Sequence, residues 1–147
     1  MGRKGFSLIE MMFVFVLAGV IMAIGFPRLR NSLEKQNVRS SKALLATLAA
    51  TARGTAVQRG SSATLYMTVD SIWETACGVN PPAVSVQIGT KKLVGDEFGV
   101  TLAPSAASVV YDPRGIATVF ASTSIRITSA HYTDSVVINP VGKVIQQ

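Results

Sequence analysis

The sequence predicts an α+β protein in which one long N-terminal helix packs on a small antiparallel β head. Three observations lead to this fold class. Residues 6–26 form an apolar segment with a single charge, and an amphipathic helical pattern follows it as far as Gly60. After Gly60 the chain changes to short alternating runs separated by Pro and Gly turns. Because no long helical pattern lies between these runs, we expect neighbouring strands to pair antiparallel.

The composition sets limits on the class of protein. A chain of 147 residues is one domain, or a small head on a long helix. The formal charge is +6, and without the two basic residues of the first five, 12 basic against 8 acidic residues leave +4. This balance permits contact with nucleic acid or anionic lipid but does not require it. Cys77 is the single cysteine, which excludes an internal disulfide, and we interpret it as a packed side chain.

The apolar segment 6–26 matches the hydrocarbon core of a bilayer. Its 21 residues are about 31 Å long as a helix, against about 30 Å for the core. Arg3 and Lys4 before it favour a cytoplasmic N-terminus, although Arg28 and Arg30 after it weaken the charge rule. The end of the segment does not resemble the small-residue cleavage site of a secretory signal, so we expect a retained span.

Glu10 lies inside this apolar segment, where an ionisable group costs a few kcal/mol on insertion scales. A simple signal anchor, the alternative interpretation, leaves this residue unexplained. Cleavage after Gly5 would create a positive partner, the new amine of Phe6 on the same or a neighbouring helix. A carboxylate paired with a neighbour's N-terminus would fix the axial stagger of packed helices, so Glu10 predicts assembly.

The residues Gly5-Phe6-Ser7-Leu8-Ile9-Glu10 resemble the prepilin signature of type IV pilins and type II secretion pseudopilins. The resemblance implies that a prepilin peptidase removes a leader, residues 1–5, and that Phe6 is then N-methylated. Pro27 stands where pilins commonly have a helix-kinking proline. Because proline lacks a backbone N–H, we expect a kink or local loosening there, with helix continuing behind it. Residues 6–27 would form the transmembrane and assembly helix.

Residues 28–60 are expected to form an amphipathic helix that packs on the head. The residues that recur at helical spacing form one stripe: Leu29, Leu33, Val38, Leu45, Ala49, Ala52 and Ala56. Alanine-rich turns favour helix here, and Gly60 is a suitable C-terminal stop. We interpret the stripe as a core face and not as a ligand site.

Residues 61–147 are expected to form the β-rich head. The expected strands are 63–69, 84–88, 100–102, 108–111, 117–120, 124–128, 135–139 and 143–145. Turn signals separate them at 80–82, 95–96, 112–115 and 140–142. A small sheet with one apolar face would pack on the helical stripe.

A second set of residues lies in the later part of the chain. It consists of Ala52-Arg53, Ala56, Arg59-Gly60 and, after a strand, Trp73. A strand with a proline–glycine turn follows at 109–115, and a closing glycine–basic step at 138–144. Together these resemble the minor pseudopilins called H and the related pilus protein FimT, which implies a minor subunit near the tip of a fibre.

Nothing in the sequence indicates catalysis, a metal site or a cofactor. His131 is the single histidine, which excludes a histidine-rich metal site. No local motif supports nucleophilic catalysis by Cys77 with His131. Residues 96–97 and Asp134 are acidic, but they lack the spacing of a calcium loop. We interpret Trp73 as a residue that packs within the head, and we expect a protein that is not an enzyme.

Three functions compete. The first is a minor subunit of a type II secretion pseudopilus, and the second is a FimT-like minor pilin of a type IV pilus. A major pilin, the third, is weakened by the lack of a cysteine pair and by the resemblance of the head. The expected partners are other pilin or pseudopilin subunits, the prepilin peptidase, inner-membrane lipid and the assembly platform. The expected location is the bacterial inner membrane, crossed once with the head in the periplasm, and then the fibre.

DNA is the weaker partner expectation. The resemblance to FimT-like DNA binders implies a glycine-arginine-x-arginine motif near the C-terminus. This chain has Gly142-Lys143-Val144-Ile145 there, so only the first basic position is kept, as Lys143. Lysine lacks the bidentate grip of arginine on phosphate, which leaves Lys143 as a weak candidate contact.

Overall fold

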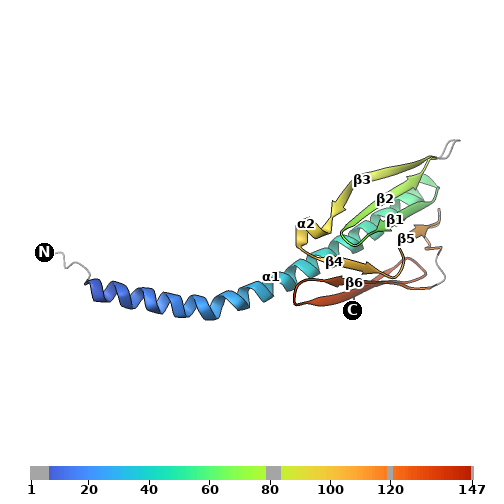
Figure 1. Cartoon of the computed structure of the whole chain (residues 1–147). Coiled ribbons are helices and arrows are strands. Elements are labelled where there is room, and N and C mark those ends of the chain that lie inside the picture. The colour runs from blue at the N-terminus through green and yellow to red at the C-terminus, as the bar shows by residue number, and fades with distance from the viewer. Residues whose placement is uncertain (1–6, 79–83, 119–120, 147) are drawn as a thin grey trace. The chain divides into compact units, whose positions relative to one another are not determined.

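The computed structural model describes residues 7–78, 84–118 and 121–146. The chain divides into two compact units between Leu33 and Glu34, and each is described by itself. The first helix, α1, extends from Leu8 to Arg59 (Figure 1) and is unbroken at Pro27, so the loosening expected there does not interrupt it. The cleavage site at Gly5 and Phe6 lies outside the described residues.

Helix α1 ends where the sequence predicts. Gly60 adopts a left-handed φ of 58°, which glycine reaches without the strain that a Cβ would cause. The Gly60 N–H donates to the Val57 carbonyl and the Ser61 N–H to the Ala56 carbonyl, each at 3.3 Å. These two bonds form the Schellman arrangement that satisfies the last carbonyls of a helix. The chain then reverses into the first strand.

The head contains two four-stranded sheets. The first has the order β3-β2-β1-β5 and the second β4-β6-β7-β8. The strands are β1 Ala63–Met67, β2 Ser71–Cys77, β3 Ser85–Leu93, β4 Thr101–Pro104, β5 Ser108–Tyr111, β6 Thr123–Thr128, β7 Thr133–Ile138 and β8 Val144–Gln146, with helix α2 at Val94–Phe98. Every named strand pair is antiparallel, which confirms the predicted fold class.

Several local expectations were wrong. The described residues form two sheets and not one. Strand β2 was missed, because its polar residues, such as Glu74 and Thr75, hid its alternation. The turn expected at 95–96 is part of helix α2. Ala117 forms only an isolated bridge with Tyr111. Thr118 of that expected strand is in no strand, although its N–H donates to the Val110 carbonyl at 2.8 Å. Residues 119–120 and the expected turn at 80–82 lie outside the described residues.

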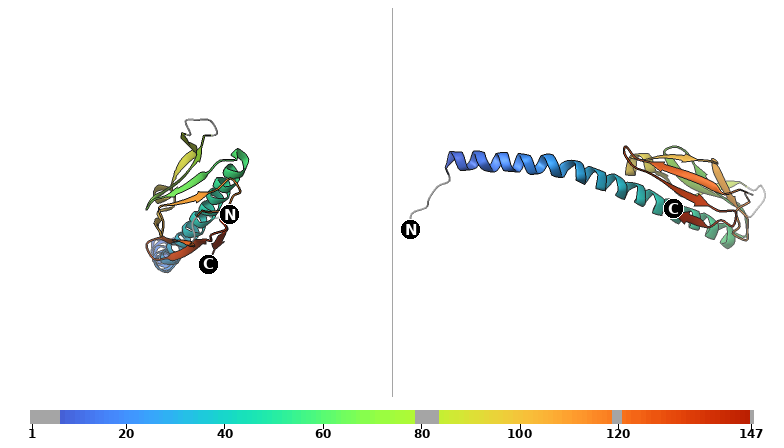
Figure 2. Two further views of the ribbon diagram at one scale, coloured as in Figure 1. Left: turned by 90° about the vertical axis from the view of Figure 1, so that its right-hand side faces the viewer. Right: turned by 90° about the horizontal axis from the view of Figure 1, so that it is seen from below.

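The core lies between residues 34–59 of α1 and the two sheets, which the right-hand view of Figure 2 shows on one side of the helix. The buried apolar residues of α1 are Val38, Leu45, Ala49, Ala52 and Ala56. This confirms the predicted stripe from Val38 onward. Leu29 and Leu33 belong to the other unit and are 57% and 54% exposed, so the expectation that they begin the packed face was wrong.

Polar contacts join the start of this helical part to the turn between β6 and β7. The His131 N–H donates to Glu34 Oε2 at 3.0 Å, and its Nδ1 lies 3.1 Å from Oε1. Lys42 Nζ lies 2.7 Å from Asp134 Oδ2, and the Lys42 side chain is 7% exposed. Burial alone would raise the pKa of Asp134, but bonds from Lys42 and Ser135 and nearby positive charge outweigh it and lower the pKa.

Candidate functional site

The N-terminal unit presents an apolar surface. From Leu8 to Leu33 every residue is exposed except Ala18, which is half-buried. Part of α1 is long and apolar enough to cross a membrane. Gly19, Gly25 and Pro27 line a shallow, open stretch of this exposed helical surface. A Cβ added to Gly19 or Gly25 would meet nothing within 4 Å, so neither glycine is needed for packing within the chain.

Glu10 is the one acidic residue on this surface. It is exposed in the first turn of α1, where a carboxylate is favoured by the helix dipole. The Glu10 N–H donates to the carbonyl of Ser7, the residue before α1, at 3.1 Å. Within residues 7–78, 84–118 and 121–146, no side chain forms an ion pair with Glu10. The described chain therefore leaves this carboxylate open to a partner.

The head carries a buried acid that the sequence analysis missed as a site. Glu74 on β2 faces the core opposite Leu65 and is 6% exposed. In the described part of the chain, no hydrogen-bond partner reaches its Oε2. Burial raises the pKa of Glu74, while a hydrogen bond with Thr51 acts in the opposite direction. The sequence signal for a buried Glu74 is the alternation of β2, which places Glu74 and Trp73 on opposite faces. This signal could be used only if β2 had been predicted as a strand.

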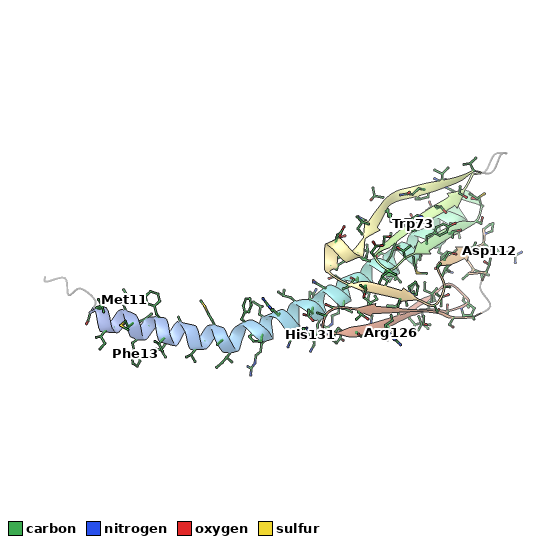
Figure 3. All side chains as sticks on the ribbon, in the orientation of Figure 1. Met11, Phe13, Trp73, Asp112, Arg126 and His131 are labelled. Atoms are coloured by element: carbon green, nitrogen blue, oxygen red, sulfur yellow. The ribbon has the colours of Figure 1, made fainter. Side chains whose placement is uncertain are left out.

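Trp73 lies on β2 (Figure 3), and its alternation with the buried Glu74 places it on the face away from the core. Its ring stacks on Tyr66 with centroids 5.3 Å apart and an angle of 11° between the planes. Lys91 Nζ lies 4.9 Å from the centre of the same ring. The indole therefore contacts Tyr66 and Lys91 and is only half-buried, so it packs on the sheet surface and not in the core.

Lys143 lies at a groove between α1 and the turn that precedes β8. The groove has a volume of about 260 Å³ and is lined by Ala46, Ala50, Arg53, Gly54, Gly142, Lys143 and Val144. Lys143 and Arg53 are both exposed. The fold thus brings the predicted basic residue together with a second cation from α1, a juxtaposition that the linear motif did not reveal.

Tyr111 explains why a glycine precedes Lys143. Gly142 has a φ of 80°, and a Cβ there would lie 2.8 Å from the Tyr111 ring, so both conformation and space require glycine. Tyr111 is fully buried, and among the described residues its hydroxyl has no partner. Burial raises the pKa of Tyr111 to about 12, against the opposite influence of Arg53, so the hydroxyl is neutral at physiological pH.

In the residues that the structure describes, the candidate catalytic and metal-binding side chains have other partners or positions. His131 is paired with Glu34, and Asp134 with Lys42. Cys77 is half-buried, and its backbone carbonyl accepts a bond from the Ser61 hydroxyl. Within the described ranges, no group of three histidine, cysteine or acidic side chains could hold a metal ion.

Comparisons with known proteins agree with this geometry. Residues 1–26 match the family model of the prokaryotic N-terminal methylation motif, and residues 43–142 match that of the type II transport protein GspH. A crystal structure of the type IV minor pilin FimU from Pseudomonas aeruginosa (strain PAO1) has a TM-score of 0.60 at 13% identity, over 78% of this chain and 90% of that one. A second crystal form gives 0.57 at 13% identity, over 74% and 91%. No curated protein matches the sequence.

A long apolar N-terminal helix that continues into an antiparallel β head, together with the methylation motif, defines a type IV pilin-like subunit. More specifically, the chain belongs to the family of the type II transport protein GspH, whose model matches more than half of it. The family and the fold are those of structural subunits that assemble with other pilin-like subunits.

Proposed function

We propose that the chain is a minor pseudopilin of a type II secretion system, which assembles through its N-terminal helix and supports protein secretion. The precursor spans the inner membrane once, with its head in the periplasm. A prepilin peptidase cuts between Gly5 and Phe6, and Phe6 is N-methylated. The mature subunit then leaves the lipid through the assembly platform and enters the pseudopilus.

The observation that carries this proposal is the single carboxylate of Glu10 on an exposed apolar helix. The apolar residues favour the lipid and, after assembly, the neighbouring helices. Glu10 opposes insertion by a few kcal/mol, which many apolar neighbours offset. The amine of Phe6, released by cleavage, is a cation of suitable size four residues before Glu10. Their attraction is strongest in the low-dielectric interior of a fibre.

Pro27 and the glycines beside it have a role in this account. Proline leaves the carbonyl four residues earlier without its helical donor, so the helix is easier to deform there. Gly19 and Gly25 have no side chain on this exposed surface, so a neighbouring helix can approach their backbone closely. This part of α1 would therefore adapt to its neighbours during assembly.

Replacing Glu10 by alanine tests the proposal. The Glu10→Ala precursor should insert in the membrane at least as well as wild type and should still be cut after Gly5. It should enter fibres and support secretion far less well, by about tenfold or more for a loss of 1.4 kcal/mol. Gln36→Ala, a change of an exposed polar residue of α1 outside the apolar segment, is the control. Normal fibre entry and secretion by Glu10→Ala would contradict the pairing mechanism.

A FimT-like pilin that contacts DNA is the second candidate, and the groove at Lys143 favours it. Arg53 and Lys143 come from separate elements and are exposed at one groove, so their charges would add at a single phosphate path. The apolar residue at position 145, where the resembled motif has an arginine, weakens this candidate.

Double replacement of Arg53 and Lys143 by alanine tests the DNA candidate. The full chain should lose affinity for duplex DNA, and the slope of log affinity against log salt should fall by about two. Arg126→Ala, which removes an exposed cation from β6, is the control. If the wild-type chain binds no DNA at low salt, or if the double variant and the control bind equally well, this function is excluded for the groove.

A further inference from the structure

Strand β3 forms an open edge of the first sheet. It is the last strand in the order β3-β2-β1-β5, and no strand of the described chain lies on its other side. It has nine residues, whereas the other edge strands have three or four. Short edges are one way in which proteins avoid unwanted pairing, and β3 does not have this protection.

The ladder shows which main-chain groups of β3 face outward. The Gly78 N–H donates to the Val84 carbonyl at 3.0 Å. Hydrogen-bonded and non-hydrogen-bonded pairs alternate in an antiparallel ladder, so Val84, Val86 and Ile88 direct their N–H and C=O groups toward β2. Ser85 and Gln87 therefore direct theirs toward the open edge.

The neighbouring pair of strands gives an independent check. Cys77, which lies opposite Ser85, donates its N–H to the Ser62 carbonyl at 2.9 Å on the β1 side. Its main-chain groups are thus turned away from Ser85. The alternation derived from Gly78 holds across the strand, and the outward amides of Ser85 and Gln87 are not part of the ladder with β2.

The side chains of this segment are also uncovered. Val86 lies opposite Ala76, on the face of the sheet that carries the core, yet it is 49% exposed. Val84 is 60% exposed. An added strand would cover both valines with its own apolar side chains, and the gain from burial would add to that from the main-chain bonds.

The second half of β3 is less suited to pairing and has a distinct charge. Gly89 has a φ of 68°, and the register shifts on β2 between Ile72 and Glu74, opposite this half of the strand. Lys91, exposed above Trp73, and Lys92 follow. A second copy that paired through its own β3 would bring another two lysines to the same edge. A strand with an acidic residue near Lys91 fits the charge better.

We propose that residues 84–88 of β3 accept an extended strand from the head of a different pilin-like subunit, in register with the outward amides of Ser85 and Gln87. The donated strand has apolar residues at alternate positions, over Val84 and Val86, and an acidic residue toward Lys91. This inference rests on the proposed assembly, to which it adds a contact between heads.

Amide hydrogen exchange of the full chain tests this inference. It would be measured for the chain alone in detergent and for fibres extracted from the cell. In the chain alone, the amides of Ser85 and Gln87 should exchange faster than that of Val86. In fibres, both should slow by at least about tenfold, as expected for a hydrogen bond that opens only when the strand separates. Unchanged exchange at Ser85 and Gln87 in fibres would overturn the proposal.

A pair of variants identifies the occupant. Gln87→Pro removes one outward N–H and leaves the ladder with β2 intact, a position where edge strands accept proline. It should lower the amount of chain in fibres by about tenfold, whereas Gln87→Val, which keeps the N–H, should not. Equal incorporation of the two variants contradicts the proposal, and so does protection that appears in the chain alone with rising concentration, because it indicates self-pairing. A wild-type chain that never enters fibres contradicts the proposed assembly itself, while entry with an unprotected β3 contradicts only the edge contact.

Discussion

Glu74 shows how a single buried residue contributes to the pH dependence of the head. Its carboxyl group is buried against α1, and burial raises its pKa above the ordinary value of 4.5. Well below pH 4.5 the group is protonated in both the folded and the unfolded chain, so its ionisation does not change the free energy of unfolding. As the pH rises through the folded-state pKa, folding must either keep the proton or bury a charge, so the head loses stability.

Glu74→Gln should therefore stabilise the head at neutral pH. The amide keeps a neutral polar group beside Thr51 and cannot ionise. We expect the free energy of unfolding to rise by roughly 1 kcal/mol at pH 7, with the gain shrinking to near zero at pH 4.5. Urea unfolding of both proteins across this pH range measures the difference. A gain in stability that is largest at low pH would contradict a raised pKa of Glu74 in the folded head.

At the scale of elements, the second half of α1 approaches the sheets through small side chains. Ala49, Ala52 and Ala56 are buried along one line of the helix. Alanine favours the helix and leaves room for the strands to pack near the helical backbone. The cost is that this surface has no space for larger side chains, because protein cores are already close-packed.

Ala52→Leu should test this close approach. Three added carbon atoms at a fully buried site should destabilise the head by about 1–3 kcal/mol through overpacking. Ala43→Leu, at an exposed position of the same helix, is the matched control and should change stability by no more than about 0.5 kcal/mol. Thermal unfolding by circular dichroism checks both. Similar melting temperatures for the two variants would contradict the packing described.

The elements differ in how far the sequence determines them. Helix α1 and its end at Gly60 were predicted because periodicity and capping are local signals. Strand β2 was not, because its buried Glu74 and outward Trp73 reverse the usual polarity of a strand. The groove at Lys143 depends on Arg53, which is 90 residues earlier in the chain, so no local pattern could predict it.

At the scale of the whole molecule, the chain has a helical part for assembly and a part, from Glu34 onward, that we expect to fold alone. The unit from Glu34 onward contains every strand and every buried core residue that the structure describes. A fragment of residues 34–147 should be soluble and melt cooperatively, with both helix and strand signals. A shorter fragment of residues 38–147 lacks Glu34, which pairs with His131, and should melt a few degrees lower. Aggregation of the longer fragment in several buffers would contradict the division.

The most direct test of the central claim, that the chain is processed after Gly5 for assembly through its helix, is the intact mass of the protein extracted from its own membranes. The account predicts a mature chain that begins at Phe6 and carries one added methyl group. Gly5→Trp should leave the longer precursor, because a bulky side chain hinders the close approach of a peptidase to the backbone. A wild-type chain that still begins at Met1 or Gly2 in a cell with an active prepilin peptidase would contradict the account.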